Sequence, residues 1–152
     1  PTLERAGIRK WVNGAFTFTP DGNPLVGPVP GLRNFWAACG CMGGFSQGGA
    51  VVLAHLLRQT VPVAGVMALS SYLPLGGKNA EEITEAAKGI PVFMAHGSFD
   101  PVVPIGLGEY SRRQLQQFGL QVQFKSYPMQ HNVCPDEIRA MGDWLSERFA
   151  AR

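Results

Sequence analysis

The chain has 152 residues, of which 45% are hydrophobic and 16% are charged, and this balance is typical of one globular domain with a substantial core. The 13 lysine and arginine residues and the 11 aspartate and glutamate residues give a formal net charge of +2, and the basic residues are scattered rather than clustered. Because nucleic acids and anionic membranes are bound through clustered positive charge, the pattern indicates neither kind of partner.

Turn signals occur at short intervals in residues 1–31, for example at residues 13–14 (Asn-Gly) and 20–22 (Pro-Asp-Gly). Between these turns, Ala15–Phe18 alternates small or polar residues with aromatic ones, and Leu25–Val26 follows the Asp-Gly turn. We therefore expect a short β-hairpin in this turn-rich N-terminal extension.

From Asn34 onward, apolar runs of strand length alternate with longer helical patterns, which is typical of an α/β domain with a parallel sheet. The apolar runs predict strands at Phe35–Cys39, Val63–Leu69, Pro91–Ala95 and Val122–Tyr127. Helical spacing and helix-start residues predict helices at Gly48–Gln59, Asn79–Lys88, Ile105–Phe118 and Pro135–Phe149. Strands this apolar are expected to be buried on both faces of the sheet.

Residues 44–48, Gly-Phe-Ser-Gln-Gly, fit the G-x-S-x-G turn, in which a strand passes sharply into a helix and presents a nucleophilic serine. Glycine suits the positions two residues before and after the serine, because side chains there would collide with the neighbouring strand and helix. Ser46 is therefore a candidate nucleophile, and the backbone N–H of Gln47 is a candidate oxyanion donor at a helix start. The same glycine-rich stretch also suits a backbone that lies against a cofactor, so the motif alone leaves two interpretations.

An acid and a base follow the serine along the chain. Asp100 comes just after one predicted strand, and His131 comes just after the last one. Because the carboxyl ends of parallel strands meet at one edge of a sheet, both side chains are expected near Ser46. Taken singly, Asp100 fits a turn residue in an Asp-Pro pair, and His131 fits a helix-start residue. Together, in the order Ser, Asp, His of α/β hydrolases, the three residues predict a catalytic triad.

The other two histidines indicate structural roles. His96 lies at the end of a predicted strand, and we expect it to brace the loop that carries Asp100. His55 lies within an otherwise apolar helix turn, where a packed or partly exposed structural histidine is expected rather than a metal ligand.

The cysteines predict neither a disulfide framework nor a metal site. Cys39, Cys41 and Cys134 are an odd number, in a chain with no signal-peptide pattern and no apolar run of membrane-spanning length. Cys39-x-Cys41 has no further cysteine or histidine nearby to complete a set of metal ligands. We therefore expect a cytoplasmic protein without a structural metal.

Four segments of the chain resemble one protein family. They read GFSQGGAVVLAHLL, VAGVMALSSYLP, IPVFMAHGSFDPVVP and YPMQHNVCPDEIRAMGDWL, and the resemblance extends over residues 44–152. These motifs closely resemble the bacterial carboxylesterase and acyl-protein thioesterase-like family of α/β hydrolases. The resemblance implies that Ser46 is the nucleophile, His131 the general base and acid, and Asp100 the residue that orients the histidine. It implies no metal or cofactor.

The sequence before Gly44 departs from that family, in which several strands and a His-Gly loop precede the serine and supply a second oxyanion donor. Instead, the residues up to about position 49 resemble the late flavin-domain segment of dimethylglycine and sarcosine dehydrogenase-type oxidoreductases. The two resemblances overlap in GFSQGG, so we interpret the chain as a chimera. A flavin site of this type needs a strand, a G-x-G-x-x-G turn and a helix, and this sequence has no such unit, so flavin binding is not expected.

We therefore expect a single domain, made of an N-terminal extension (residues 1–43) and the C-terminal half of an α/β hydrolase (residues 44–152). The expected function is a serine esterase that cleaves short to medium acyl esters through an acyl-enzyme. Phe45, Leu73 and Met129 are candidates for the acyl pocket and equally for the core. The alternative is a weak or inactive hydrolase fragment, because one missing oxyanion donor costs about 10²–10³ in turnover. A flavin-oxidoreductase fragment is the third possibility.

A truncated parallel sheet also predicts a partner. Four parallel strands without further neighbours would leave the strand before Ser46 as an unpaired apolar edge. We expect residues 1–43 to cover this edge or two chains to pair across it, and a homodimer is the favoured outcome.

Overall fold

The computed structural model describes residues 25–28, 36–39, 45–61, 63–74 and 78–150, with side chains described from Gly48 to Arg148 within these ranges. In chain order, the elements are β1 (Leu25–Pro28), β2 (Trp36–Cys39), α1 (Phe45–Leu57), β3 (Val66–Leu69), α2 (Asn79–Glu82), the 3₁₀ helix η3 (Glu85–Ala87), β4 (Pro91–Gly97), α3 (Ile105–Gln117), β5 (Gln121–Tyr127) and α4 (Pro135–Ala150). The alternation of strands and helices confirms the predicted α/β class.

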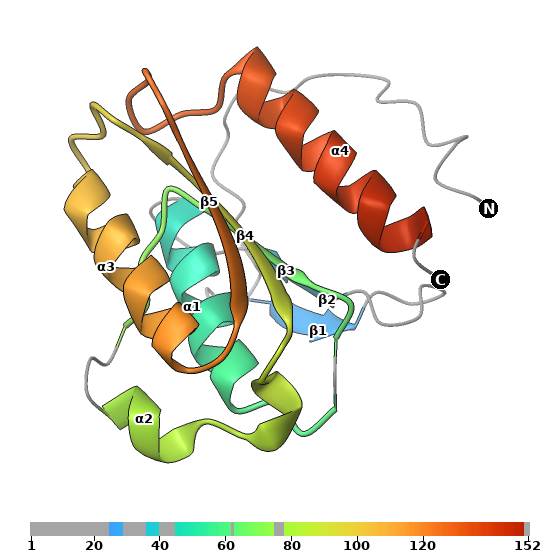
Figure 1. Ribbon diagram of the computed structural model, residues 1–152. Helices are drawn as coiled ribbons and strands as arrows, with labels where there is room; N and C mark the ends of the chain where they lie inside the picture. Colours follow the sequence, from blue (N-terminus) through green and yellow to red (C-terminus); the bar gives the residue numbers. More distant parts are fainter. Residues whose placement is uncertain (1–24, 29–35, 40–44, 62, 75–77, 151–152) are drawn as a thin grey trace.

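Strands β3, β4 and β5 form a parallel sheet in that order. Val66 of β3 lies beside Val92 of β4, and Pro91 of β4 lies beside Gln121 of β5. Because the strands are parallel, all three carboxyl ends lie at one edge of the sheet, at the top in Figure 1. The sheet therefore collects the loops that follow β3, β4 and β5 in one place.

The central strand β4 is buried on both faces, as its apolar sequence predicts. Val92 and Met94 contribute to a core cluster with residues of α1 and α3, while Phe93 and Ala95 pack with Trp144 of α4. This alternation follows from the pleat of a strand, which sends successive side chains to opposite faces.

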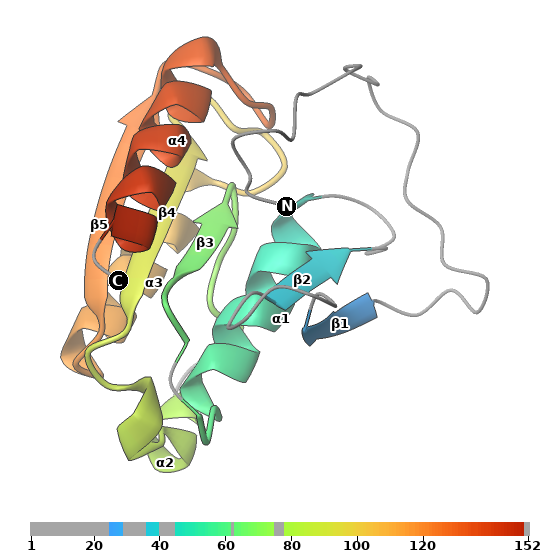
Figure 2. The same ribbon diagram turned by 90° about the vertical axis from the view of Figure 1, so that its right-hand side faces the viewer.

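Helices cover both faces of the sheet in a three-layer arrangement. Helices α1 and α3 lie on one face and α4 lies on the other, as the two views show (Figure 1, Figure 2). The larger core lies beneath α1 and α3 and consists of Leu53, Leu56, Leu57, Ala68, Leu73, Ile90, Val92, Met94, Leu115 and Leu120. Among the described helices, none is both long enough and apolar enough to cross a membrane.

The edge strand β5 differs from the prediction that every strand is buried on both faces. Its residues alternate, with Gln121, Gln123 and Lys125 exposed and Val122 and Phe124 half-buried. An edge strand beside a single helical layer needs only one apolar face, so its polar residues face solvent. Charged and polar residues on this edge also discourage pairing with other chains.

The strand before Ser46 was expected to be the fourth parallel strand, and this prediction is wrong. Strand β2 pairs antiparallel with β1 in a separate two-stranded sheet, with Leu25 opposite Cys39 and Pro28 opposite Trp36. Two short strands can satisfy each other's backbone hydrogen bonds in this way without the main sheet. Of the predicted hairpin, Ala15–Phe18 lies outside the described residues, and Leu25–Val26 belongs to β1.

The helix predicted at Asn79–Lys88 is interrupted. Ile83 has an extended backbone conformation (φ −69°, ψ 129°), so α2 ends there and η3 follows after Thr84. The N–H of Thr84 donates to the carbonyl of Leu57 at 2.9 Å, and its hydroxyl donates to the carbonyl of Gln59. These bonds to the end of α1 replace the helical bonds that a continuous helix would require, and β-branched residues lose little by leaving a helix.

Candidate active site

Asp100 and His131 occupy the loops that leave the carboxyl ends of the two longest strands. Asp100 lies three residues after Gly97, which ends β4, and His131 lies four residues after Tyr127, which ends β5. The start of α1 lies at this same end of the sheet (Figure 1). This is the edge at which α/β folds place ligands and catalytic groups.

The carboxylate of Asp100 is buried and fully hydrogen-bonded. Oδ1 accepts hydrogen bonds from the backbone N–H groups of Val102 at 2.8 Å and Val103 at 2.9 Å. Oδ2 lies 2.7 Å from Nδ1 of His131. The first two bonds form a turn closed by the side chain, which fixes the carboxylate relative to its own loop.

The hydrogen bonds keep Asp100 ionised despite its burial. Burial by itself would raise the pKa of this carboxyl, but the hydrogen bonds from Val103, His131 and Val102, with the attraction of the imidazole in its protonated form, outweigh it and lower the pKa below its ordinary value of 3.8. An ionised carboxylate can only accept a hydrogen bond, so Nδ1 of His131 carries the proton in this contact.

His131 has one ring nitrogen engaged and one free for chemistry. Its side chain is 14% exposed, and Nε2 has no hydrogen-bond partner among the described residues. With the proton on Nδ1, Nε2 carries a lone pair and can accept a proton from a hydroxyl group.

The two loops are joined by backbone contacts as well as by the side-chain pair. Ser98 donates its N–H to the carbonyl of Tyr127 at 2.8 Å, and Phe99 donates to Met129 at 3.0 Å. A Cβ atom at Gly97 would lie 2.5 Å from the carbonyl oxygen of Met129 and would also meet the carbonyl of Gln130. Glycine at position 97 therefore allows the His131 loop to cross close above the end of β4.

The nucleophile candidate Ser46 lies in the first turn of α1, and its side chain, like those of Phe45 and Gln47, is outside the described part of the structure. The helix is held close to the loop after β3, because a Cβ atom at Gly49 would collide with the side chain of Ser71. The roles of Ser46 as nucleophile and of the Gln47 N–H as oxyanion donor stay predictions.

The other two candidates for an acyl pocket lie inside the protein. Leu73 belongs to the core cluster beneath α1 and α3, and Met129 is buried at 7% exposure. The N–H of Leu73 donates to Oγ of Ser111 at 2.7 Å, which ties its loop to α3. Their role in binding substrate stays a prediction.

The sequence did not single out two buried polar groups near the His131 loop. Glu137, in the first turn of α4, is fully buried, and the hydroxyl of Tyr127 is buried as well. The carboxyl oxygens of Glu137 and the hydroxyl of Tyr127 have no hydrogen-bond partner in the described part of the chain. Acidic residues in a first helical turn usually face solvent, so the sequence carried no signal of this burial.

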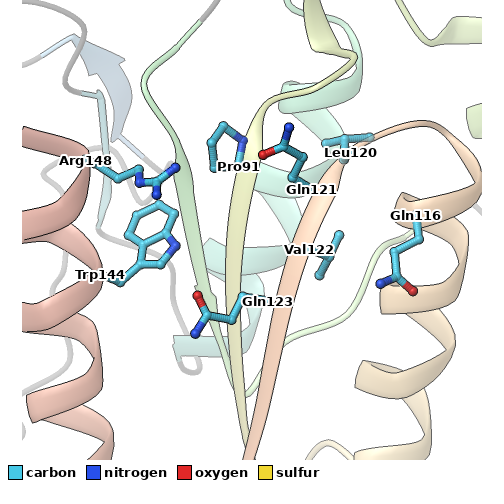
Figure 3. Close-up of a pocket in the computed structure, with 8 residues that line it drawn as sticks. All are labelled: Pro91, Gln116, Leu120, Gln121, Val122, Gln123, Trp144 and Arg148. Atoms are coloured by element: carbon cyan, nitrogen blue, oxygen red, sulfur yellow. The ribbon is translucent and has the colours of Figure 1, made fainter. Parts of the chain in front are cut away.

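A hollow of about 420 Å³ lies at the opposite end of the sheet, around the first residues of β4 and β5 (Figure 3). Its lining consists of Pro91, Gln116, Leu120, Gln121, Val122, Gln123, Trp144 and Arg148. It is separate from the Asp100–His131 pair, which follows the other ends of the same strands. Within the described ranges, no three histidine, cysteine, aspartate or glutamate side chains gather in a way that could hold a metal ion.

Comparison with known proteins gives a consistent result. The sequence profile of the family described as Phospholipase/Carboxylesterase matches residues 40–148. Acyl-protein thioesterase 1 of Neurospora crassa is 47% identical over 111 residues, covering 71% of this chain and 45% of that protein. A probable carboxylesterase of Arabidopsis thaliana, SOBER1-like, is 34% identical over 107 residues, covering 70% of this chain and 41% of that protein.

The fold is also similar to solved structures. The crystal structure of Arabidopsis thaliana SOBER1 matches with a TM-score of 0.66 and 30% identity, covering 70% of this chain and 51% of that one. The crystal structure of Zea mays acyl-protein thioesterase 2 matches with a TM-score of 0.62 and 27% identity, covering 69% of this chain and 54% of that one. The chain thus spans about half the length of these relatives.

Proposed function

Since the chain belongs to the phospholipase/carboxylesterase family of hydrolases, we propose that it hydrolyses short to medium acyl esters through a Ser46–His131–Asp100 triad. The observation that carries the proposal is the 2.7 Å contact between Nδ1 of His131 and Oδ2 of the buried Asp100. This contact orients the imidazole and leaves Nε2 unpartnered among the described residues, as a general base requires.

In the proposed reaction, Oγ of Ser46 attacks the acyl carbonyl carbon while its proton passes to Nε2 of His131. The carboxylate of Asp100 stabilises the imidazolium that forms. The ester C–O bond then breaks, and the alcohol leaves with the proton from His131. In the second half, Nε2 of His131 takes a proton from water, whose oxygen attacks the acyl carbon. The bond from that carbon to Oγ of Ser46 then breaks, Oγ regains the proton from His131, and the carboxylic acid is released.

The negative charge on the carbonyl oxygen is proposed to be met at the start of α1. A helix N-terminus has backbone N–H groups without helical partners and a dipole that favours negative charge. The N–H of Gln47 follows Ser46 directly and is the proposed first donor. The relatives include proteins named thioesterases, so the proposal is tested on oxygen esters and thioesters alike.

The test compares the wild-type chain with Ser46→Ala on a series of p-nitrophenyl esters and on an acyl-thioester. We expect turnover to fall by about 10⁶ when the nucleophile is removed. Ser126→Ala is the matched control, because Ser126 is an exposed serine on the edge strand β5. A fluorophosphonate label followed by mass spectrometry should place an adduct on Ser46. Equal rates in all three proteins with no adduct on Ser46 would favour the inert fragment instead.

We propose in addition that two copies of the chain pair through the edge of β3. Its residues Val66–Leu69 are apolar, and in the described part of the chain β3 pairs with β4 alone. An unpaired apolar strand edge is a template for another strand. Light scattering over a wide concentration range should give the mass of a dimer, and the mass of a single chain at every concentration would contradict this proposal.

A further inference from the structure

His96 is a buried polar residue that the proposed chemistry does not use. It is the second-last residue of β4, its side chain is 1% exposed, and it lies beneath the loop that carries Asp100. Burying an imidazole without a function in packing or hydrogen bonding is costly, so its partners indicate what it does.

The contacts of the ring show which of its nitrogens donates a hydrogen bond. Nε2 lies 2.8 Å from the carbonyl oxygen of Val103, and Nδ1 is buried without a partner among the described residues. A carbonyl can only accept, so Nε2 must carry the proton and donate it to Val103.

The Val103 backbone connects His96 to the triad candidate. Its carbonyl accepts from Nε2 of His96, and its N–H donates to Oδ1 of Asp100 at 2.9 Å. Nε2 also lies 3.6 Å from Oδ2 of Asp100, the oxygen that faces His131. Because Nε2 of His96 donates its hydrogen bond to the carbonyl of Val103, Oδ2 of Asp100 stays available for His131.

The ring is held in place from the other side by helix α3. A Cβ atom at Gly108 would lie 2.5 Å from Nδ1 of His96, 3.1 Å from Cε1 and 3.3 Å from Cγ. At Gly106, two residues earlier in the same helix, a Cβ atom would meet nothing within 4 Å. The backbone at Gly108 therefore packs directly against the imidazole of His96, and the ring has little room to rotate.

We propose that His96 is a positioning residue for the triad, which fixes Asp100 through Val103 while Gly108 fixes His96. The inference rests on the proposed function and adds a residue that touches no substrate. Its loss should lower kcat and leave KM nearly unchanged, because it orients the acid–base pair rather than the acyl chain.

The first test compares His96→Leu, which lacks the donor, with His96→Gln, whose side-chain amide can reach the position of Nε2. We expect His96→Leu to lower kcat by about 10- to 100-fold, the size expected for a small displacement of a catalytic group. His96→Gln should recover most of the loss. A thermal melt of each variant shows whether the fold is kept.

The second test uses the two glycines of α3 as a matched pair. Ala adds the same methyl group and the same helix propensity at both positions, but only Gly108→Ala meets the His96 ring. We expect Gly108→Ala to lower kcat and Gly106→Ala to leave it unchanged. This pair keeps the inference testable if His96→Leu does not fold.

Amide hydrogen exchange at Val102 and Val103 reports on the position of the Asp100 carboxylate and does not depend on catalytic activity. Both N–H groups donate to Asp100 Oδ1, so their protection should fall in His96→Leu and Gly108→Ala and persist in His96→Gln and Gly106→Ala. If Ser46→Ala is as active as the wild type, the proposed function fails, and the exchange data still decide the role of His96. Folded His96→Leu with unchanged kcat and unchanged protection would overturn the inference, as would equal losses in His96→Leu and His96→Gln.

Discussion

The loop after β4 and the segment that leads from β5 into α4 meet at the Asp100–His131 contact. The two differ in whether their buried polar atoms have hydrogen-bond partners. In the first region, both oxygens of Asp100 are hydrogen-bonded. In the second, the hydroxyl of Tyr127, Nε2 of His131 and the carboxyl of Glu137 are buried without partners among the described residues. The hydrogen bonds of the first region therefore hold Asp100 in one geometry, whereas the second region contains unsatisfied hydrogen-bond donors and acceptors.

Two buried carboxyls show what this difference does to ionisation. Burial raises the pKa of Glu137 above its ordinary value of 4.5, and the nearby Cys134 N–H, which lies outside hydrogen-bonding geometry, only partly opposes it. Hydrogen bonds reverse the same effect at Asp100, whose pKa is lowered. Burial raises the pKa of Tyr127 too, and the charge of Glu137 adds to this. Hydrogen bonding thus decides whether the pKa of a buried carboxyl ends above or below its ordinary value.

Between these two regions, the largest effect is expected when the hydrogen bonds of Asp100 are disrupted. Asp100→Asn keeps the shape of the side chain, but its amide can donate to His131 and favour the wrong tautomer of the imidazole. We expect kcat to fall by about 10⁴-fold with the fold intact. Steady-state kinetics on a p-nitrophenyl ester measures the loss.

Asp136→Asn is the matched control for this charge change. Asp136 lies in the first turn of α4, is exposed, and accepts a hydrogen bond from the guanidinium of Arg139 at 3.0 Å. We expect it to leave kcat unchanged. If Asp100→Asn were as active as Asp136→Asn, the ordered carboxylate would have no part in the chemistry.

The second-largest effect is expected at Gly97, where the two regions are in contact. A methyl group there would lie 2.5 Å from the carbonyl oxygen of Met129, and backbone atoms cannot rotate away as a side-chain end can. We expect Gly97→Ala to destabilise the fold by about 1–3 kcal/mol and to lower kcat, because the two loops must separate. Urea denaturation measures the free energy of unfolding.

Gly142→Ala provides the comparison for Gly97→Ala. A Cβ atom at this position in α4 meets nothing within 4 Å, so alanine should stabilise the helix by roughly 0.5–1 kcal/mol. Equal effects of the two substitutions would mean that the close passage above β4 is not a constraint.

Sequence patterns were sufficient for the elements whose neighbours are apolar and close in sequence. The run from Pro91 predicted β4, and the stripe that begins at Pro135 predicted α4, because burial alone decides both. The positions of Asp100 and His131 at one sheet edge also follow from strand order, since parallel strands end at the same side.

Patterns failed where a distant partner decides the structure. The break at Ile83 depends on the bond from Thr84 to Leu57, which no local propensity encodes. The strand β2 pairs with β1 rather than with the sheet of β3, β4 and β5, and the sequence of β2 alone does not determine which partner it takes. Within the candidate site, the burial of Glu137 depends on how α4 packs against the sheet, and an acidic residue in a first turn gives no sign of it.

The smallest effect is expected at Glu137, in the region with unpaired groups. Because its folded-state pKa is raised, Glu137 favours folding below its unfolded pKa, and this contribution is lost as pH rises through the folded pKa. At neutral pH an ionised carboxylate would be buried without a partner. Glu137→Gln removes that charge, so we expect it to raise the free energy of unfolding at neutral pH by about 1 kcal/mol.

The dependence on pH separates this effect from a simple change in packing. The advantage of Glu137→Gln should shrink as pH falls toward about 4, where the wild-type carboxyl is protonated in both states. Asp100 contributes in the opposite sense, since its lowered pKa gives stability that is lost as pH falls below its ordinary value of 3.8. Thermal melts of wild type and Glu137→Gln from about pH 4 to about pH 8 measure the difference. An advantage that stayed constant over this range would mean that the glutamine packs better and that the ionisation of Glu137 has no part in the effect.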